Sequence, residues 1–281
     1  MMPIVLVDFS VHAFFISQQY EQASKLIGDR PRMLDTWLRA NWIVRLCNPC
    51  DMFHPDTPCI PIITADGKWR NQYWRHRHAD ILGLPQYKGN RGEKALKVKH
   101  TKRVGLKYVA SSPFRLYQYA LAEADDLIAL ACRLKRAAEP ISALAQRQLY
   151  ISSIDTDLLQ LVDDGVTFAW TGPWEPRLKG VPETLAYVEK KFSVRLKSPR
   201  EFAYLKAIKG DKADNLPANC GLAMVDLWDD PGVHGEFTLH GWRQLPAFLA
   251  DLNRIDDIRP LDKRKEALKW IQQRGLPVAS L

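Results

Sequence analysis

The sequence lacks any hydrophobic run near the 18 or more residues that a membrane-spanning helix requires. Its first ten residues, MMPIVLVDFS, hold only a four-residue apolar run ending at Asp8, which is unlike a signal peptide. Internal repeats and low-complexity segments are also missing. We therefore expect a globular protein without a membrane segment, and 281 residues suffice for one large domain or two small ones.

Cysteine is scarce, with five residues in the whole chain. This odd number, without an export signal, predicts reduced thiols in a cytoplasm. Cys47, Cys50, His54 and Cys59 could in principle hold zinc, but their spacing is too irregular for a standard zinc finger.

The charge balance is basic, with 40 Lys and Arg against 32 Asp and Glu, for a net charge of +8. This excess indicates an anionic partner, with nucleic acid as the first candidate. Residues 86–107 carry eight basic residues and one Glu, a net +7 from eight minus one. The segment fits a phosphate-tracking element that binds nucleic acid without sequence preference, and the alternative is a solvated charged helix or loop.

Short apolar runs alternate with helical patterns, which is typical of an α/β fold with a mainly parallel sheet. We expect strands at 4–7, 59–63, 116–120, 149–154 and 166–170, and helices at 33–47 and 123–138. From residue 175 the pattern changes to helices broken by a Gly/Asp/Asn/Pro turn cluster. We therefore expect a catalytic domain over 1–174 and a helical region over 175–281.

Acidic residues follow the predicted strands, at the edge of a parallel sheet where active sites lie. Singly, each is explained as a helix cap or a turn former. Together they could hold two divalent ions about 4 Å apart, which would clamp the attacking and leaving oxygens of a phosphodiester. The nine candidates are Asp8, Asp66, Glu123, Asp125, Asp126, Asp155, Asp157, Asp211 and Asp214.

Three of these acids crowd the start of one predicted helix, in ALAEADDLIALAC. Two carboxylates about 4 Å apart repel by roughly 1 kcal/mol in water and by roughly 4 kcal/mol at a protein-like dielectric. A bound cation would neutralise this repulsion. Without divalent metal, we expect this corner to be the least stable part of the domain.

Six ordered blocks between Asp8 and about Leu227 resemble those of the flap-endonuclease-like 5′-nucleases. The blocks are VLVDFS, DGKWR, YKGNR, EADDLIA, SIDTDLLQLV and KGDKADNLP. That family includes bacteriophage 5′→3′ exonucleases and the 5′-nuclease domain of bacterial DNA polymerase I. The resemblance implies a three-layer PIN-like fold, two Mg²⁺ or Mn²⁺ ions, and 5′→3′ exonuclease or flap endonuclease activity on DNA or RNA–DNA hybrids. A free-standing enzyme of this kind suggests phage replication in the host cytoplasm, as a monomer.

The resemblance also implies roles for individual residues. The first metal would be held by Asp66, Glu123, Asp125 and Asp126, with Asp8 acting directly or through water. The second would be held by Asp155, Asp157 and Asp211, with Asp214 nearby. Lys88 and Arg91 would face the scissile phosphate. Residues 92–110 would form a short helical arch, and the DNA-binding candidates are Arg70, Lys94, Lys97, Lys99, Lys102, Arg103 and Lys107.

One departure concerns the hairpin after the last acidic block. Ala218 and Ala223 stand where the family has glycine, and alanine resists a positive φ, which argues against a potassium site there. Two other functions remain open. A PIN-like ribonuclease would usually lack the YKGNR and GDxxDN blocks, and an inactive DNA-binding module would be expected to lose metal acids.

Overall fold

The computed structural model describes residues 1–51, 59–67, 93–112, 114–119, 122–171 and 177–210. Within these ranges, the strands are β1 (Ile4–Asp8), β2 (Ile60–Ala65), β3 (Arg115–Gln118), β4 (Leu149–Ser153), β5 (Val166–Trp170) and β6 (Arg177–Lys179). The helices are α1 (Phe9–Ile27), α2 (Pro31–Asp51), α4 (Glu93–Ala110), α5 (Ala124–Ala137), α6 (Ala143–Gln146), the 3₁₀ helix η2 (Thr156–Leu161), α7 (Val181–Phe192) and α8 (Glu201–Lys209).

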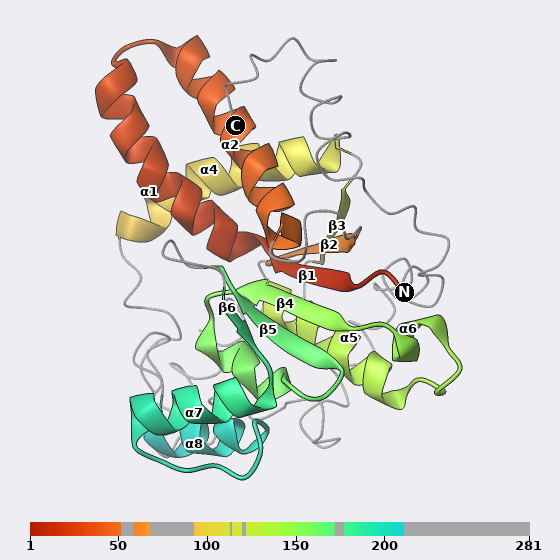
Figure 1. Cartoon of the computed structure of the whole chain (residues 1–281). Coiled ribbons are helices and arrows are strands. Elements are labelled where there is room, and N and C mark those ends of the chain that lie inside the picture. The colour runs from red at the N-terminus through yellow and green to blue at the C-terminus, as the bar shows by residue number, and fades with distance from the viewer. Residues whose placement is uncertain (52–58, 68–92, 113, 120–121, 172–176, 211–281) are drawn as a thin grey trace, which may run out of the picture.

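The strands form one sheet in the order β3-β2-β1-β4-β5-β6 (Figure 1). Every neighbouring pair is parallel except β5 and β6. The predicted α/β fold with a mainly parallel sheet is confirmed, as are the five predicted strands and the two predicted helices, to within a few residues. The antiparallel β6 was not predicted, because three residues are too few to show a period.

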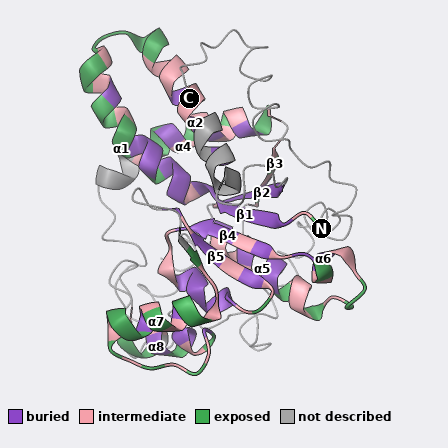
Figure 2. Ribbon diagram, in the orientation of Figure 1, coloured by how far each residue is buried: buried purple, intermediate pink, exposed green. Residues whose placement is uncertain are grey.

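The side chains of β1 point alternately to the two faces of the sheet, and each face has its own hydrophobic cluster. Val5 and Val7 belong to a cluster with Trp42, on the face covered by α1, α2 and α4. Ile4 and Leu6 belong to a second cluster, on the face covered by α5 (Figure 1). The buried side chains concentrate on and beside the sheet, whereas the far end of α1 is exposed (Figure 2). The result is the expected three-layer arrangement.

Helix α4 contains much of the basic segment. Its second half packs against α1 and α2. Thr101, Gly105 and Val109, spaced four residues apart, are buried. The Trp42 ring stacks on Phe9 with centroids 4.3 Å apart, and its Nε1 donates to the Thr101 carbonyl at 3.1 Å. The segment predicted as an arch is therefore a helix with one face in the core, at least over residues 98–110.

Gly105→Ala is expected to destabilise the protein by about 1–3 kcal/mol, because overpacking a core forces its neighbours to move. A Cβ at this position would lie 2.1 Å from Trp42 Cε2, and the stacked Trp42 has little room to retreat. Urea unfolding would measure the loss. The matched control is Gly180→Ala, whose Cβ would meet nothing nearer than the Glu183 carboxylate at 3.2 Å. An equal effect of both substitutions would contradict the packing argument.

The start of the predicted second region packs on the sheet. Val188 of α7, together with Phe202 and Leu205 of α8, belongs to the same cluster as Leu158 of η2. A domain boundary at 174/175 stays a prediction, and the expected hairpin after residue 210 lies outside the described residues.

Two of the remaining expectations concern thiols and membranes. Cys132 is a buried thiol that forms no disulfide, as predicted, but Cys59 is disulfide-bonded, so the expectation of reduced cysteines is wrong for that residue. The disulfide also removes the Cys59 thiolate from the zinc alternative. In the described part of the chain, no helix is both long and apolar enough to cross a membrane.

Candidate metal centre

Four carboxylates gather at the carboxyl edge of the sheet, as the sequence predicts. Asp8 ends β1, Asp66 follows β2, Asp155 follows β4, and Asp125 lies in the first turn of α5. The strands β2, β1 and β4 are adjacent and parallel, so their ends meet at one edge. Besides burial, repulsion from Asp66 and Asp155 raises the pKa of Asp8, and repulsion from Asp155, Asp8 and Asp66 raises that of Asp125, so the four carboxylates lie close together.

Asp8 is buried at the centre of this group. Its Oδ1 accepts hydrogen bonds from the backbone N–H groups of Ser10 and Val11, at 3.0 and 3.4 Å, and so caps α1. Its Oδ2 accepts from the Ser153 hydroxyl at 2.9 Å. Burial, followed by repulsion from Asp66 and Asp155, raises the pKa of Asp8 from 3.8 to about 7 in spite of these donors.

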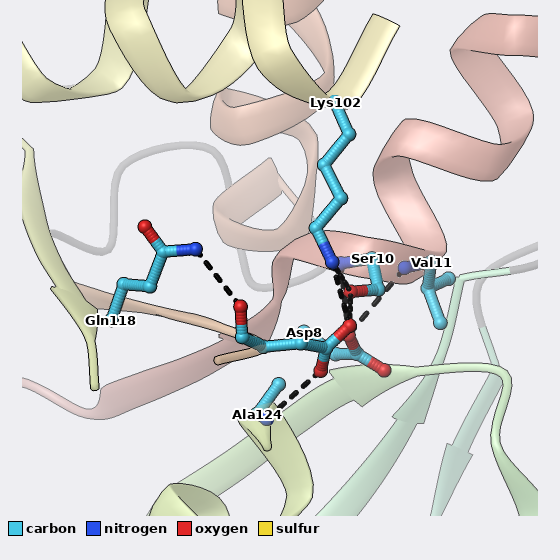
Figure 3. Close-up of polar contacts among 7 residues, drawn as sticks. Asp8, Ser10, Val11, Lys102, Gln118 and Ala124 are labelled. Carbon is cyan, nitrogen blue, oxygen red and sulfur yellow. Dashed lines mark hydrogen bonds and ion pairs between the residues drawn. The ribbon is translucent and has the colours of Figure 1, made fainter. Parts of the chain in front are cut away.

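Asp66 has the opposite electrostatic environment. Desolvation alone would raise its pKa, but the Lys102 ammonium and the hydrogen bonds around it hold the pKa well below the ordinary value. Lys102 Nζ of α4 lies 2.7 Å from Asp66 Oδ2 and 3.0 Å from Ser10 Oγ, and the Ser10 hydroxyl donates to the same carboxylate oxygen (Figure 3). Asp66 Oδ1 accepts from the Ala124 backbone N–H at 3.0 Å.

The three crowded acids of the EADD block have separate environments. Glu123 is buried and precedes α5, and Asp126 Oδ2 accepts from the Glu123 backbone N–H at 2.8 Å in a capping box. Asp125 belongs to the acidic cluster. Desolvation, then repulsion from Asp155 and Asp8, raises its pKa well above the ordinary value. Capping therefore explains Asp126, whereas repulsion within the cluster is concentrated on Asp125.

Asp155 and Asp157 also differ. Asp155 is the N-cap of η2, and its Oδ1 accepts from the Asp157 backbone N–H at 2.9 Å. The Asp157 carboxylate is buried and forms an ion pair with Lys206 of α8 at 2.9 Å, where the two side chains are 9% and 12% exposed. The structure thus directs Asp155 toward the acidic cluster and pairs Asp157 with a lysine.

The cluster fits a divalent cation by its chemistry. Its donors are hard carboxylate oxygens, its buried like charges destabilise one another, and Asp66 already accepts a cation in the form of the Lys102 ammonium. Within the described ranges, no three His, Cys, Asp or Glu side chains converge closely enough to form a complete metal-binding group. Asp8, Asp66, Asp125 and Asp155 are the residues best placed to hold a cation if Lys102 withdraws.

The remaining candidates are distributed unevenly. Lys99, Arg103 and Lys107 are exposed on α4, and their contact with DNA stays a prediction, whereas Lys102 is turned into the acidic cluster. The following candidates lie outside the described residues or have side chains outside them: Arg70, Lys88, Arg91, Lys94, Lys97, Asp211 and Asp214.

Sequence reasoning missed three polar residues of the site. Ser10 lies three residues after the predicted strand 4–7 and Ser153 lies near the end of the predicted strand 149–154, so their positions could have suggested them. Lys206 carries no such signal, because it is one of two lysines in the last turn of α8.

Comparisons with known proteins support the fold. Neither protein-family models nor curated protein sequences gave a match. Among solved structures, the chain is similar to the bacteriophage T5 5′-exonuclease with bound zinc, at 18% identity and a TM-score of 0.50, over 96% of this chain and 89% of the other. It is similar also to the bacteriophage T5 D15 flap endonuclease in complex with DNA and metal ions. That match has 17% identity and a TM-score of 0.51, over 98% and 85% of the two chains. These likenesses confirm the fold that the resemblance predicted.

Proposed function

We propose that the protein is a metal-dependent 5′-nuclease that hydrolyses DNA phosphodiesters at 5′ ends, flaps or duplex junctions, as a 5′→3′ exonuclease or flap endonuclease. The observation that carries this proposal is the cluster of Asp8, Asp66, Asp125 and Asp155 at one sheet edge, directly beneath a basic helix. The shared fold supports it, because the two similar structures are an exonuclease and a flap endonuclease. We place its action in phage replication, in the host cytoplasm.

The acidic residues would hold two Mg²⁺ or Mn²⁺ ions. Asp8, Asp66 and Asp125 would serve the first, and Asp155 and Asp157 the second. When bound, such ions lower the pKa of a coordinated water and stabilise the charge that develops on the phosphate. Asp8 is fixed by three donors and Asp66 by the Ala124 backbone, so these carboxylates are oriented before any ligand arrives.

Nucleic-acid binding would rely on α4. Lys99, Arg103 and Lys107 are exposed on the same helix whose Lys102 contacts the acidic cluster. A backbone phosphate held by these side chains would lie near the carboxylates. Such contacts are independent of sequence, which suits an enzyme that recognises the end or the shape of its substrate.

One assay tests the proposal and its alternatives. The purified full-length chain would be incubated with 5′-labelled DNA flap, blunt duplex, single-stranded DNA, RNA–DNA hybrid and single-stranded RNA. Each reaction would contain Mg²⁺ or EDTA. We expect cleavage of the DNA substrates with Mg²⁺ only. Cleavage confined to RNA would favour the PIN-like ribonuclease, and binding without cleavage would favour an inactive DNA-binding module.

A further inference from the structure

Lys102 occupies an unusual position for a residue of a basic, DNA-facing helix. Its Nζ lies 2.7 Å from Asp66 Oδ2 and 3.0 Å from Ser10 Oγ, and its side chain is only 23% exposed. Figure 3 shows this side chain reaching from α4 down to the acidic cluster. A side-chain ammonium therefore takes up part of the cluster's capacity to bind a cation.

The backbone that carries Lys102 is firmly held. The neighbouring Thr101 donates through its hydroxyl to the Ala13 carbonyl of α1 at 3.3 Å, and its own carbonyl accepts from Trp42 Nε1 of α2. Gly105, one turn further on, packs tightly against Trp42. Because this part of α4 is docked, the flexible side chain of Lys102 can leave Asp66 while its backbone stays beside the site.

We propose that Lys102 competes with the divalent cation for Asp66 and, once displaced, binds a DNA phosphate, so that metal binding and DNA binding support each other through one side chain. The inference rests on the proposed function. Asp66 accepts from Lys102 and Ser10 through the same oxygen, Oδ2, so a cation on that oxygen must displace the ammonium. Displacement leaves an uncompensated lysine beside the cluster, close to where the exposed α4 cations would hold a phosphate.

The first measurement is cation affinity in the absence of DNA. Mn²⁺ would be titrated into the metal-free full-length protein by calorimetry, for wild type, Lys102→Met and Lys102→Gln. Removing the competitor should tighten binding of the first Mn²⁺ by about tenfold, a coupling of ordinary size. The control is Lys190→Met, the same chemical change at an exposed lysine of α7, which should leave the affinity unchanged. Circular dichroism would establish that each variant is folded. If Lys102→Met disturbs α4, Lys102→Gln provides the comparison with wild type.

The second measurement is the affinity for a fluorescent 5′-flap DNA, in EDTA and in Ca²⁺. Lys102→Met should weaken binding by about tenfold in Ca²⁺ and leave it nearly unchanged in EDTA, where Lys102 of the wild type is engaged with Asp66. Lys107→Met, at an exposed position on the same helix, should weaken binding equally in both conditions.

The outcomes separate the two claims. If the wild type neither binds Mn²⁺ nor cleaves DNA, the proposed function fails, and this inference with it. If the wild type does both, but the Lys102 variants bind Mn²⁺ no more tightly than wild type, the competition is refuted and the proposed function stands. Equal losses of DNA affinity in EDTA and Ca²⁺ would make Lys102 an ordinary phosphate contact and overturn the coupling.

Discussion

Asp155→Asn is expected to lower Mg²⁺-dependent cleavage of a 5′ flap by about 10²–10³-fold or more, the loss typical when one group that stabilises transition-state charge is removed. The fold should survive. Asp155 Oδ1 accepts from the Asp157 backbone N–H, and an asparagine oxygen caps this position equally well. The substitution also removes one charge from the repelling cluster that includes Asp8 and Asp125.

The measurement is single-turnover cleavage of a labelled flap, with a thermal melt of the same preparation. Asp164→Asn provides the matched control, because Asp164 is an exposed acid on the connection between β4 and β5. It should retain wild-type activity. Full activity in Asp155→Asn would remove Asp155 from the proposed machinery.

The neighbouring Asp157 is a poorer test, and only the structure shows why. Asp157→Asn would leave the Lys206 ammonium, 12% exposed, without its charged partner. Breaking a buried ion pair by removing one member costs about 3–5 kcal/mol. Lost activity could then reflect lost structure. The double variant Asp157→Asn/Lys206→Met separates the two effects, because it removes both charges together.

The contrast between these two aspartates shows what the sequence could predict. The alternation of apolar runs with helical patterns predicted the central sheet, because each strand's burial is determined locally by its own residues. The topology of parallel sheets then placed Asp8, Asp66 and Asp155 at one edge. The prediction of the sheet thus depends on the local pattern of apolar residues, and the prediction of the acidic cluster depends in addition on the general topology of parallel sheets.

The partners of those acids could not be predicted in the same way. Lys102 and Lys206 are ordinary helix lysines in the sequence, and their pairing with Asp66 and Asp157 depends on how α4 and α8 dock on the sheet. Docking is determined by distant contacts, such as Gly105 against Trp42, which no short window of sequence contains. The sequence alone therefore predicts either phosphate contacts or a solvated face for the basic segment, and neither prediction includes the ion pair of Lys102 with Asp66.

The metal-free protein is expected to become less stable as the pH rises from about 4 to about 7, and Asp8→Asn should abolish much of this loss. The pKa of Asp8 is about 7 in the folded protein and ordinary, near 3.8, in the unfolded chain. Between these values the folded state binds more protons than the unfolded state, so the free energy of unfolding falls with rising pH. Asp125, whose pKa is raised by burial and then by repulsion from its neighbours, contributes in the same direction.

Asparagine at position 8 keeps the oxygen that caps α1 but carries no charge. In EDTA, the stability of Asp8→Asn relative to wild type should therefore increase by about 2–3 kcal/mol between pH 5 and pH 8. Urea unfolding at several pH values would measure this difference. Addition of Mg²⁺ at pH 8 should reverse the order, because a ligand stabilises only the protein that binds it. If the stability difference between Asp8→Asn and wild type stays constant from pH 5 to pH 8, Asp8 is charged throughout this range. Burial and repulsion within the cluster would then be too weak to require a cation.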